Sequence, residues 1–504
     1  MAHLNFNASN VKPAKGEDLP NHSRQWSSYQ EVIFNFVEHG QGNAIVEAVA
    51  GSGKSTTIVE ALNRVNGSSV FLAFNKAIAD ELKARGVNAR TFHSLTYSPT
   101  MRWKRQNNVT TDKLRAICRE NLGADDMELY SSFAIRLVGL AQQLGIGCLV
   151  LDVEEVWMDI VIHHDLEPES EDADLGRGIE IARWLLDASY EDSRVNFDDM
   201  LYLTVRDNLT LPKFDFVFVD EAQDTNAIQR EILKKIMHPR TRLIAVGDSA
   251  QAIYGFRGAD SNSMNLIAQQ FNCTKLPLSI TYRCPTSVVK YARTIVNHIQ
   301  ARPNAPEGKV EGLGTKWEVK SFQPNDLVVC RTTKPLIALA FQMVRARVPV
   351  RIMGREIGQG LKNLITKMKA RNLDDLENKL SNWRDKEVEK AVKKDNESKA
   401  EAIRDKVDAI LCIIEGLSPD QEYEAGIVDL LNQIDNLFAE GVGKTVLATI
   451  HKAKGLEAEH VYWLNSSQCP SKWARAEWQK RQELNLMYVA ITRAKSTLTL
   501  IEEK

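Results

Sequence analysis

The sequence lacks the features that mark secreted, zinc-binding or membrane-spanning proteins. Its 504 residues include only seven cysteines, and these are scattered without a CxxC pair or a Cys/His cluster. Neither a disulfide framework nor a zinc site is therefore indicated. No run approaches the ~18 apolar residues of a membrane span, and the polar N-terminal stretch lacks the apolar core of a signal peptide. We expect a cytoplasmic protein of a bacterial or phage-infected cell, not secreted, with no membrane partner.

A strong excess of charge of one sign is also missing. The formal net charge is -2 although 26% of the residues are charged, so no general basic surface indicates a polyanionic partner. Any nucleic-acid site must therefore be a local patch. The hydrophobic content of 43% is typical of a globular protein. The length exceeds that of a single core, and we expect roughly two to four domains.

The stretch EAVAGSGKST (47–56) joins an apolar strand pattern to a helical pattern. Gly51 and Gly53 let successive backbone N–H groups converge on phosphate oxygens, and Lys54 can neutralise the terminal phosphates. The Ser55 hydroxyl can bind Mg²⁺. An ordinary strand-to-helix turn is the alternative. The nucleotide-contacting residues predicted from this loop are Ala50, Gly51, Ser52, Gly53, Lys54, Ser55 and Thr56.

A second motif, FDFVFVDEAQDT (214–225), predicts a buried parallel strand that ends in a group of acids. Ligands of open α/β sheets bind at such strand ends. Asp220 is placed there to hold Mg²⁺, and Glu221 to polarise a water in line with a γ-phosphate. A solvated acidic turn is the alternative for the acids alone. Together the two motifs predict a nucleoside triphosphate hydrolase.

Further motifs follow in order along the chain: FLAFNKAIADEL (71–82), TFHSL (91–95), VGDSAQAIYGFRGA (246–259), TYRCP (281–285), TIHKAKGLEAEHV (449–461) and LNLMYVAITRAK (484–495). The full set resembles the UvrD/Rep type of superfamily 1 DNA helicase, in particular its compact phage, bacterial and F-box-helicase members. The resemblance implies an α/β fold of two RecA-like P-loop lobes, each with a parallel sheet flanked by helices. It also implies that ATP and Mg²⁺ bind between the lobes and that the protein translocates on single-stranded DNA, 3′ to 5′, and unwinds duplexes.

The resemblance extends to the adenosine part of ATP. Gln30 resembles the family's glutamine that recognises the adenine edge, although without the resemblance it would be an ordinary amide on a helix surface. Tyr282 offers an aromatic face on which the base can stack. Glu457 resembles the residue that contacts the ribose or the nearby cleft.

The resemblance also supplies residues for the γ-phosphate. Gln251 resembles the glutamine that senses this phosphate and couples it to DNA. Arg283 and Arg493 can reach the phosphate from the opposite lobe, which would make hydrolysis depend on closure of the lobes. Surface salt bridges are the alternative for both arginines. The predicted catalytic residues are Lys54, Asp220, Glu221, Gln251, Arg283 and Arg493.

Aromatic residues beside cations and hydroxyls mark the predicted DNA site. Aromatic faces stack bases of any sequence at about 1–3 kcal/mol per base, while hydroxyls and cations hold phosphates. The family usually has tryptophan where this chain has Phe256, which stacks over less area. Core packing is the alternative for Phe92 and Phe256. The predicted DNA contacts are Phe74, Thr91, Phe92, His93, Tyr254, Phe256, Arg257, Thr449, His451, Lys452 and Trp473.

The spacing of the motifs predicts the domain organisation: a polar lead (1–25), a first lobe (26–96 and 211–283) with a helical insertion (97–210), and a second lobe (284–356 and 441–504) with a short charged helical insertion (357–440). The mixed charge of the second insertion favours a solvated helical hairpin or bundle over a DNA-binding arm. This insertion is shorter than the corresponding domain of the larger family members.

Trp473 and Trp478 precede the last motif, where the related enzymes carry a strand-separating pin. We expect Trp473 to stack on the last base pair of a junction between single-stranded and duplex DNA. A translocase that strips bound proteins, and a motor subunit of a larger nuclease or defence complex, are the alternatives to a helicase. Candidate protein partners are a single-strand-binding protein or a recombinase.

Overall fold

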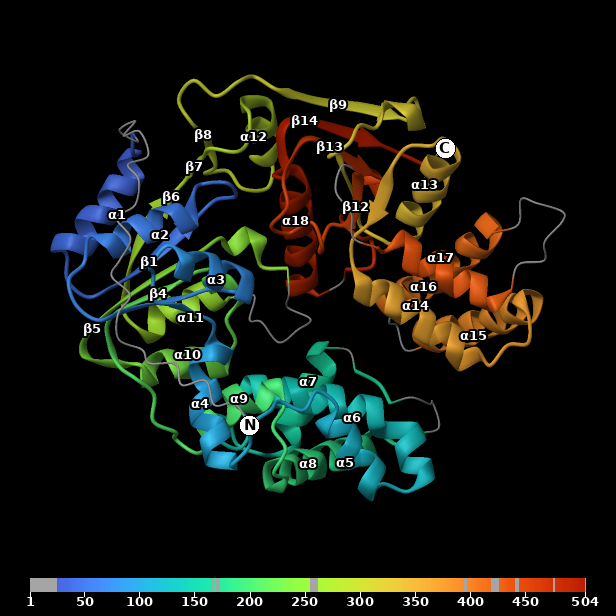
Figure 1. Ribbon diagram of the computed structural model, residues 1–504, viewed down its shortest axis with the longest axis horizontal. Helices are drawn as coiled ribbons and strands as arrows, with labels where there is room; N and C mark the ends of the chain where they lie inside the picture. Colours follow the sequence, from blue (N-terminus) through green and yellow to red (C-terminus); the bar gives the residue numbers. More distant parts are fainter. Residues whose placement is uncertain are drawn as a thin grey trace, which may run out of the picture.

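The computed structural model describes residues 25–164, 166–168, 173–253, 262–393, 397–417, 426–439, 444–474 and 476–503. The predicted DNA contacts Tyr254, Phe256 and Arg257 lie outside the described residues, as does nearly all of the polar lead. Two sheet-containing lobes lie side by side, and two helical bodies are attached to them (Figure 1). Among the described helices, none is long and apolar enough to cross a membrane.

The first sheet has six parallel strands in the order β3-β2-β4-β5-β1-β6. Its central strands are apolar and buried, as expected for a parallel sheet covered on both faces. The strands are β1 (Asn43–Ala48), β2 (Ser69–Leu72), β3 (Ala89–Arg90), β4 (Phe214–Val219), β5 (Met237–Gly247) and β6 (Cys273–Leu278). The flanking helices are α1 (Ser28–His39), α2 (Lys54–Asn63), α3 (Lys76–Ala84), α10 (Ala227–Lys235) and α11 (Ser263–Gln270).

A helical body enters the chain between β3 and β4. It consists of α4 (Phe92–Lys104), α5 (Lys113–Asn121), α6 (Ala124–Leu144), α7 (Glu154–His164), α8 (Leu175–Glu191) and α9 (Phe197–Arg206). A fully buried ion pair at 2.7 Å joins Lys113 to Asp199 inside it. Gln142 also donates to this carboxylate, at 2.9 Å, so the buried charges are hydrogen-bonded as such pairs require.

The second sheet is also parallel, with the strand order β11-β12-β10-β13-β14-β9. Its strands are β9 (Lys309–Gly314), β10 (Leu327–Cys330), β11 (Val350–Ile352), β12 (Thr445–Thr449), β13 (Ala458–Leu464) and β14 (Ala494–Ile501). Its helices are α12 (Thr286–Ala292), α13 (Lys334–Arg345) and α18 (Glu477–Ile491), and the small pair β7 (Ile280–Thr281) and β8 (Gln300–Ala301) lies near α12. The expected α/β fold with two parallel-sheet lobes is confirmed.

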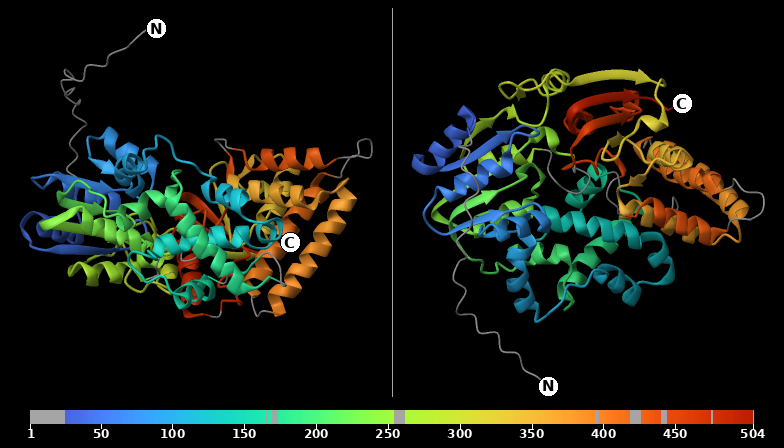
Figure 2. Two further views of the ribbon diagram at one scale, coloured as in Figure 1. Left: turned by 90° about the horizontal axis from the view of Figure 1, so that it is seen from below. Right: turned by 45° about the horizontal axis from the view of Figure 1, so that its top comes forward.

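A second helical body enters between β11 and β12, with α14 (Arg355–Met368), α15 (Leu373–Lys393), α16 (Glu397–Leu417) and α17 (Ile427–Leu437). The two helical bodies lie next to each other beside the lobes (Figures 1 and 2). An ion pair between Lys399 and Glu167 joins them. The two lobes also share apolar packing, because Val49 and Ile253 of the first lobe belong to the same core cluster as α18.

Candidate nucleotide site and DNA-facing surface

The loop between β1 and α2 has the backbone geometry of a phosphate cradle. Gly51 and Gly53 have φ of +69° and +78°, a conformation that glycine adopts without strain. A Cβ at Gly51 would lie 2.5 Å from Cβ of Arg283, so a larger residue does not fit there. Since α2 begins at Lys54, the loop presents backbone N–H groups at a helix N-terminus.

The acids at the end of β4 face this loop. Lys54 Nζ lies 3.0 Å from Glu221 Oε1, and the Ser55 hydroxyl donates to Asp220 Oδ2 at 3.0 Å. Burial and the neighbouring Glu221 charge raise the pKa of Asp220. Burial would also raise the pKa of Glu221, but the ammonium groups of Lys54 and Lys454 outweigh it and lower the pKa. Glu221 is therefore held ionised beside Lys54.

The pair Ser55 and Asp220 fits a Mg²⁺ ion chemically. A hydroxyl and a carboxylate are the oxygen donors that Mg²⁺ prefers, and their separation of 3.0 Å lets both contact one ion. Such Mg²⁺ sites use one or two protein carboxylates, while substrate phosphates and waters complete the coordination shell. The remaining ligands would therefore come from the nucleotide and solvent.

Gln30 and Tyr282, the two residues predicted to contact adenine, lie together beside the loop. The Tyr282 hydroxyl donates to Gln30 Oε1 at 3.1 Å, and Gln30 Nε2 donates to Thr57 Oγ1 at 2.9 Å. Gln30 is only 4% exposed, so the alternative of a helix-surface amide is wrong. Tyr282 is 40% exposed, and its backbone N–H donates to the carbonyl of Gly51 at 2.8 Å. An aromatic face is thus fixed beside the phosphate loop.

Arg283, the last residue of the predicted first lobe, and Arg493 of the second lobe both contact second-lobe residues. Arg283 Nε donates to Glu457 at 2.6 Å and a terminal nitrogen donates to the carbonyl of Thr492 at 3.2 Å. Arg493 is buried, donates to the carbonyls of Val489 and Leu456, and lies 3.5 Å from Gln251 Oε1. Burial and the Arg283 charge lower the pKa of Arg493 to about 10. A surface salt bridge is therefore the wrong interpretation of Arg493.

A pocket with a volume of about 450 Å³ lies between the lobes next to the phosphate loop. Its lining includes Gly51, Gly53, Tyr282, Arg283, Glu457 and Lys495. The backbone of the phosphate loop, the ring of Tyr282 and the guanidinium of Arg283 thus line the same pocket. A nucleotide in it would contact both lobes at once.

Three of the residues predicted to contact DNA gather on the first lobe. Phe74 is 49% exposed and lines a pocket with Thr91 and His93. Phe197, 54% exposed at the start of α9, lies with its ring centroid 6.0 Å from that of His93. The expected stacking role of Phe92 is wrong for this arrangement, because Phe92 is 7% exposed and packs in the hydrophobic core. The resulting platform consists of the exposed rings of Phe74 and Phe197 and the half-buried ring of His93.

The second lobe places its candidates differently. Thr449 is buried, and its hydroxyl accepts the backbone N–H of Lys452 at 3.4 Å. His451 lines a cavity of about 540 Å³ that also contains Arg331 and residues of both helical bodies. Trp473 is half-buried with the Lys472 ammonium 4.6 Å from its ring centroid. Phe74 and His451 thus both lie where the helical bodies join the lobes, because their pockets include residues of those bodies.

Comparison with known protein families identifies the family of this chain. Residues 30–272 match the UvrD/REP helicase N-terminal domain, and residues 351–504 match the UvrD-like helicase C-terminal domain. The chain belongs to the UvrD-like helicase family. Its two matched segments contain the phosphate loop and the DEAQD acids on one side, and Glu457 and Arg493 on the other.

Relatives of this chain are named as DNA helicases. The F-box DNA helicase protein 1 of Schizosaccharomyces pombe is 24% identical over 522 aligned positions, covering 90% of this chain and 55% of the relative. A probable DNA helicase II homolog of Mycoplasma pneumoniae is 26% identical over 301 residues, 53% of this chain and 42% of the relative. The ATP-dependent DNA helicase Rep of Escherichia coli is 32% identical over 133 residues, 26% of this chain and 19% of Rep. The chain spans about half the length of the first two.

Sequence reasoning missed several residues that join the lobes of this UvrD-like helicase. Lys454 forms an ion pair with Asp224 at 2.7 Å and donates to the carbonyl of Gln251 at 2.8 Å. Asn485 donates to the carbonyl of Ala252 at 2.9 Å. The Tyr488 hydroxyl accepts the backbone N–H of Ala50, in the phosphate loop, at 2.9 Å.

A signal for two of these residues was present. Asn485 and Tyr488 are three positions apart on α18, so they lie on one face of the helix, and Thr492 follows four positions later. A polar stripe on the apolar C-terminal half of this helix indicates a polar partner. The identity of this partner could not be predicted from the sequence, because the phosphate loop lies more than 400 positions away along the chain.

Proposed function

We propose that this chain is an ATP-dependent DNA helicase that translocates on single-stranded DNA, 3′ to 5′, and separates strands at junctions with duplex DNA. The observation that carries the proposal is the pocket that Arg283 lines together with Gly51 and Gly53 of the phosphate loop, while Arg493 lies buried beside Gln251. The polarity rests on the family resemblance. The names of the relatives support the activity, and all of them contain the word helicase.

ATP binding exchanges one partner of Lys54 for another. In the described structure Lys54 is paired with Glu221, and a γ-phosphate in the loop competes for the same ammonium. Once released from Lys54, Glu221 is free to orient a water and accept its proton. Ser55 and Asp220 would hold Mg²⁺, whose chemistry is to neutralise charge on the phosphate oxygens. The ion pair with Lys54 therefore keeps Glu221, the proposed general base, occupied until nucleotide arrives.

Hydrolysis is coupled to movement through the lobe contacts. Arg283 and Arg493 stabilise the charge that develops on the γ-phosphate only when the lobes are closed. Lys454 lies three positions after His451, and it contacts Gln251 and Asp224 on the first lobe. Loss of the γ-phosphate thus loosens the contacts of Lys454 with Gln251 and Asp224, which lie close to the predicted DNA contact His451. The strand held by the two lobes then shifts as they separate.

Strand displacement with the purified protein, ATP and Mg²⁺ tests the proposal. We expect unwinding of a duplex with a 3′ single-stranded tail, no unwinding of the matched 5′-tailed duplex, and no activity of Lys54→Ala on either. Unwinding of the 5′-tailed duplex alone would overturn the polarity. ATP hydrolysis stimulated by single strands without unwinding of either substrate would instead support a translocase that strips proteins.

Replacement of Trp473 by alanine tests the predicted strand-separating residue. The ring lies in the segment before α18, under the Lys472 ammonium, and its removal takes away an aromatic face worth about 1–3 kcal/mol of stacking. We expect unwinding to fall roughly tenfold while ATP hydrolysis stimulated by single strands stays within about twofold. Trp184→Ala, at a partly exposed tryptophan of α8, is the matched control. Equal loss of unwinding and hydrolysis, or loss of neither, would remove this role.

A further inference from the structure

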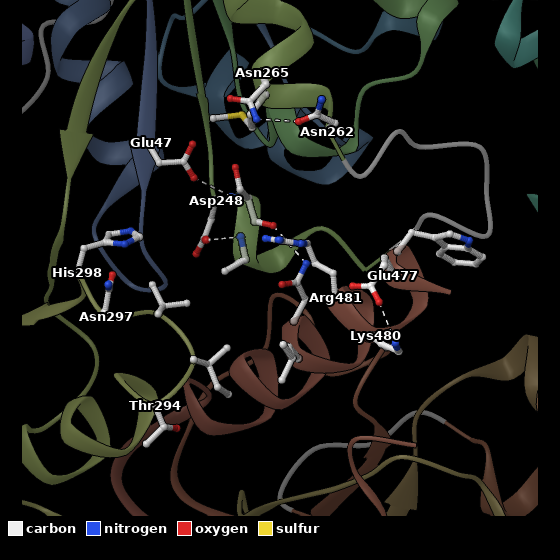
Figure 3. A pocket seen from close by; sticks show the side chains of 18 of the residues that line it. Glu47, Asp248, Asn262, Asn265, Thr294, Asn297, His298, Glu477, Lys480 and Arg481 are labelled. Atoms are coloured by element: carbon white, nitrogen blue, oxygen red, sulfur yellow. Dashed lines mark hydrogen bonds and ion pairs between the residues drawn. The ribbon is translucent and has the colours of Figure 1, made fainter. Parts of the chain in front are cut away.

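An apolar surface on the first helical body differs from the hollows between the lobes. The groove in Figure 3, with a volume of about 960 Å³, is lined mainly by polar side chains, among them Glu47, Lys480 and Arg481. The segment 144–162, which runs from the end of α6 through most of α7 (Figure 1), instead exposes large apolar side chains. Those exposed residues are Leu144, Leu149, Leu151, Val153 and Ile162.

The apolar side chains before α7 project from a fixed backbone. Gly145 ends α6 with φ of +87°, and its carbonyl accepts the backbone N–H of Leu149 at 2.7 Å. Ile146 is buried in the core of the helical body, and its carbonyl accepts the Tyr202 hydroxyl at 2.5 Å. Leu151 is nevertheless 77% exposed. A surface that is already ordered binds a partner at a lower cost in conformational entropy.

The outer face of α7 carries further exposed residues. Glu155, Asp159 and Ile162 follow one another at intervals of four and three positions, so they lie on one face of the helix. Ile162 is 70% exposed, whereas the residues of the opposite face pack into the core. The buried residues of α7 are Trp157, Ile160 and Val161. The exposure of Ile162 is therefore not explained by packing within this chain.

The charge of the segment 144–162 has one sign. It contains no lysine, arginine or histidine, and its acids are Asp152, Glu154, Glu155 and Asp159. Asp152 is engaged, since it accepts from Arg183 Nε at 3.0 Å. The other three acids are exposed, and within the described part of the chain none of them forms an ion pair. They repel phosphate groups and attract a cationic ligand.

These features favour a protein partner over a nucleic acid or a small molecule. Of the described residues that line the nucleotide pocket and the pockets of Phe74 and His451, none belongs to this segment. Exposed apolar side chains with charged neighbours are typical of protein–protein contacts. The complementary partner carries apolar side chains for the leucines and lysine or arginine for the acids. An amphipathic helix presents both groups on adjacent faces.

We propose that the surface formed by Leu149, Leu151, Val153 and Ile162 docks a partner protein through a basic amphipathic helix. The apolar side chains supply the affinity, and the exposed acids of α7 steer and orient the partner. The bound helix leaves the nucleotide pocket and the predicted DNA contacts uncovered. Docking is therefore independent of ATP and of single-stranded DNA, and it goes beyond the proposed function because it concerns what holds the protein rather than what the protein does.

A fluorescent peptide of leucine and lysine at helical spacing, about 18 residues long, tests this docking surface. Fluorescence anisotropy should show that the wild type binds the peptide and that Leu151→Ser/Ile162→Ser binds it on the order of tenfold more weakly or worse. Glu155→Lys/Asp159→Lys should also weaken binding and remove most of its salt dependence. The same peptide with glutamate in place of lysine should not bind the wild type.

Val32→Ser/Val428→Ser, at exposed valines of α1 and α17, is the matched control and should bind the peptide as the wild type does. Thermal unfolding checks that the substitutions leave the fold intact. Equal affinity of Leu151→Ser/Ile162→Ser and the wild type, or no binding by the wild type, would overturn the docking surface. None of these measurements needs ATP or DNA, so a failed unwinding assay leaves them unaffected.

Two further measurements distinguish other occupants of the surface. Weaker binding of oligothymidylate by Leu151→Ser/Ile162→Ser would assign the surface to DNA. Light scattering that shows a dimeric wild type and a monomeric variant would assign it to a second copy of this chain. Either result would overturn a basic partner, whereas unchanged oligothymidylate affinity and an unchanged oligomeric state support it.

Discussion

Glu221→Gln is expected to lower ATP turnover by about 100- to 10,000-fold, the usual contribution of a general base, while ATP still binds. Glu221 lies at the end of β4, 3.0 Å from Lys54, and its pKa is lowered by the Lys54 and Lys454 ammonium groups against the effect of burial. The ionised carboxylate is therefore available to orient water near neutral pH. Glutamine retains the size of the side chain but cannot accept a proton.

Single-turnover hydrolysis measures the loss of turnover, and binding of a fluorescent ATP analogue measures whether ATP affinity is retained. Lys54→Ala should weaken binding as well, because it removes the cation that contacts the terminal phosphates. Glu60→Gln, the same change at a surface position of α2, should leave both quantities unchanged. Loss of analogue binding by Glu221→Gln to the extent seen for Lys54→Ala would show that Glu221 acts mainly by holding the pocket together.

The fold and the phosphate side of the site follow from local patterns. Apolar runs that end in glycines or acids predicted β1 and β4, and the glycine-rich loop predicted where α2 begins. Parallel packing then brings the ends of those strands to one edge, which explains why Ser55 and Asp220 meet. These features depend on residues close together in the chain, so the sequence predicts them directly.

Contacts between distant segments were harder to predict. Phe92 resembled a stacking residue by its type, but Leu95 and Thr96 share its helical face and all three are buried, so helical spacing was the better guide. Phe197 lies in the helical body beside His93, although more than a hundred positions separate them. Burial and long-range proximity depend on how separate elements pack, and a one-dimensional pattern does not contain that information.

The lobe interface links these local and distant features. The phosphate loop is held by its own glycines, but its Ala50 N–H donates to Tyr488 of α18, and Tyr282 donates to the carbonyl of Gly51. The same helix α18 contacts the Ser249–Ala252 segment through Asn485. A change in the position of α18 therefore acts on the loop and on the Ser249–Ala252 segment together. The second lobe thus contributes to the geometry of the nucleotide site as well as to its charge.

Arg283→Ala is expected to lower ATP turnover by about 1,000-fold or more, the effect of an arginine supplied across a cleft to a phosphoryl transfer. Arg283 lines the pocket between the lobes, and its contacts to Glu457 and to the carbonyl of Thr492 fix the guanidinium on the second lobe. ATP affinity should change far less than turnover, because the phosphate loop provides most ground-state contacts. Steady-state kinetics with and without single-stranded DNA measure both quantities.

Arg283→Lys separates charge from geometry at the same position. Lysine keeps the positive charge but lacks the planar fork that contacts two oxygens, so turnover should remain far below that of the wild type. Arg240→Ala, at an exposed arginine of β5, is the matched control and should leave turnover unchanged. Full activity of the lysine variant would mean that Arg283 acts as a simple counter-charge. Closure of the lobes would then serve to place charge near the phosphate, and Arg493, buried beside Gln251, would be the residue whose geometry sets the rate.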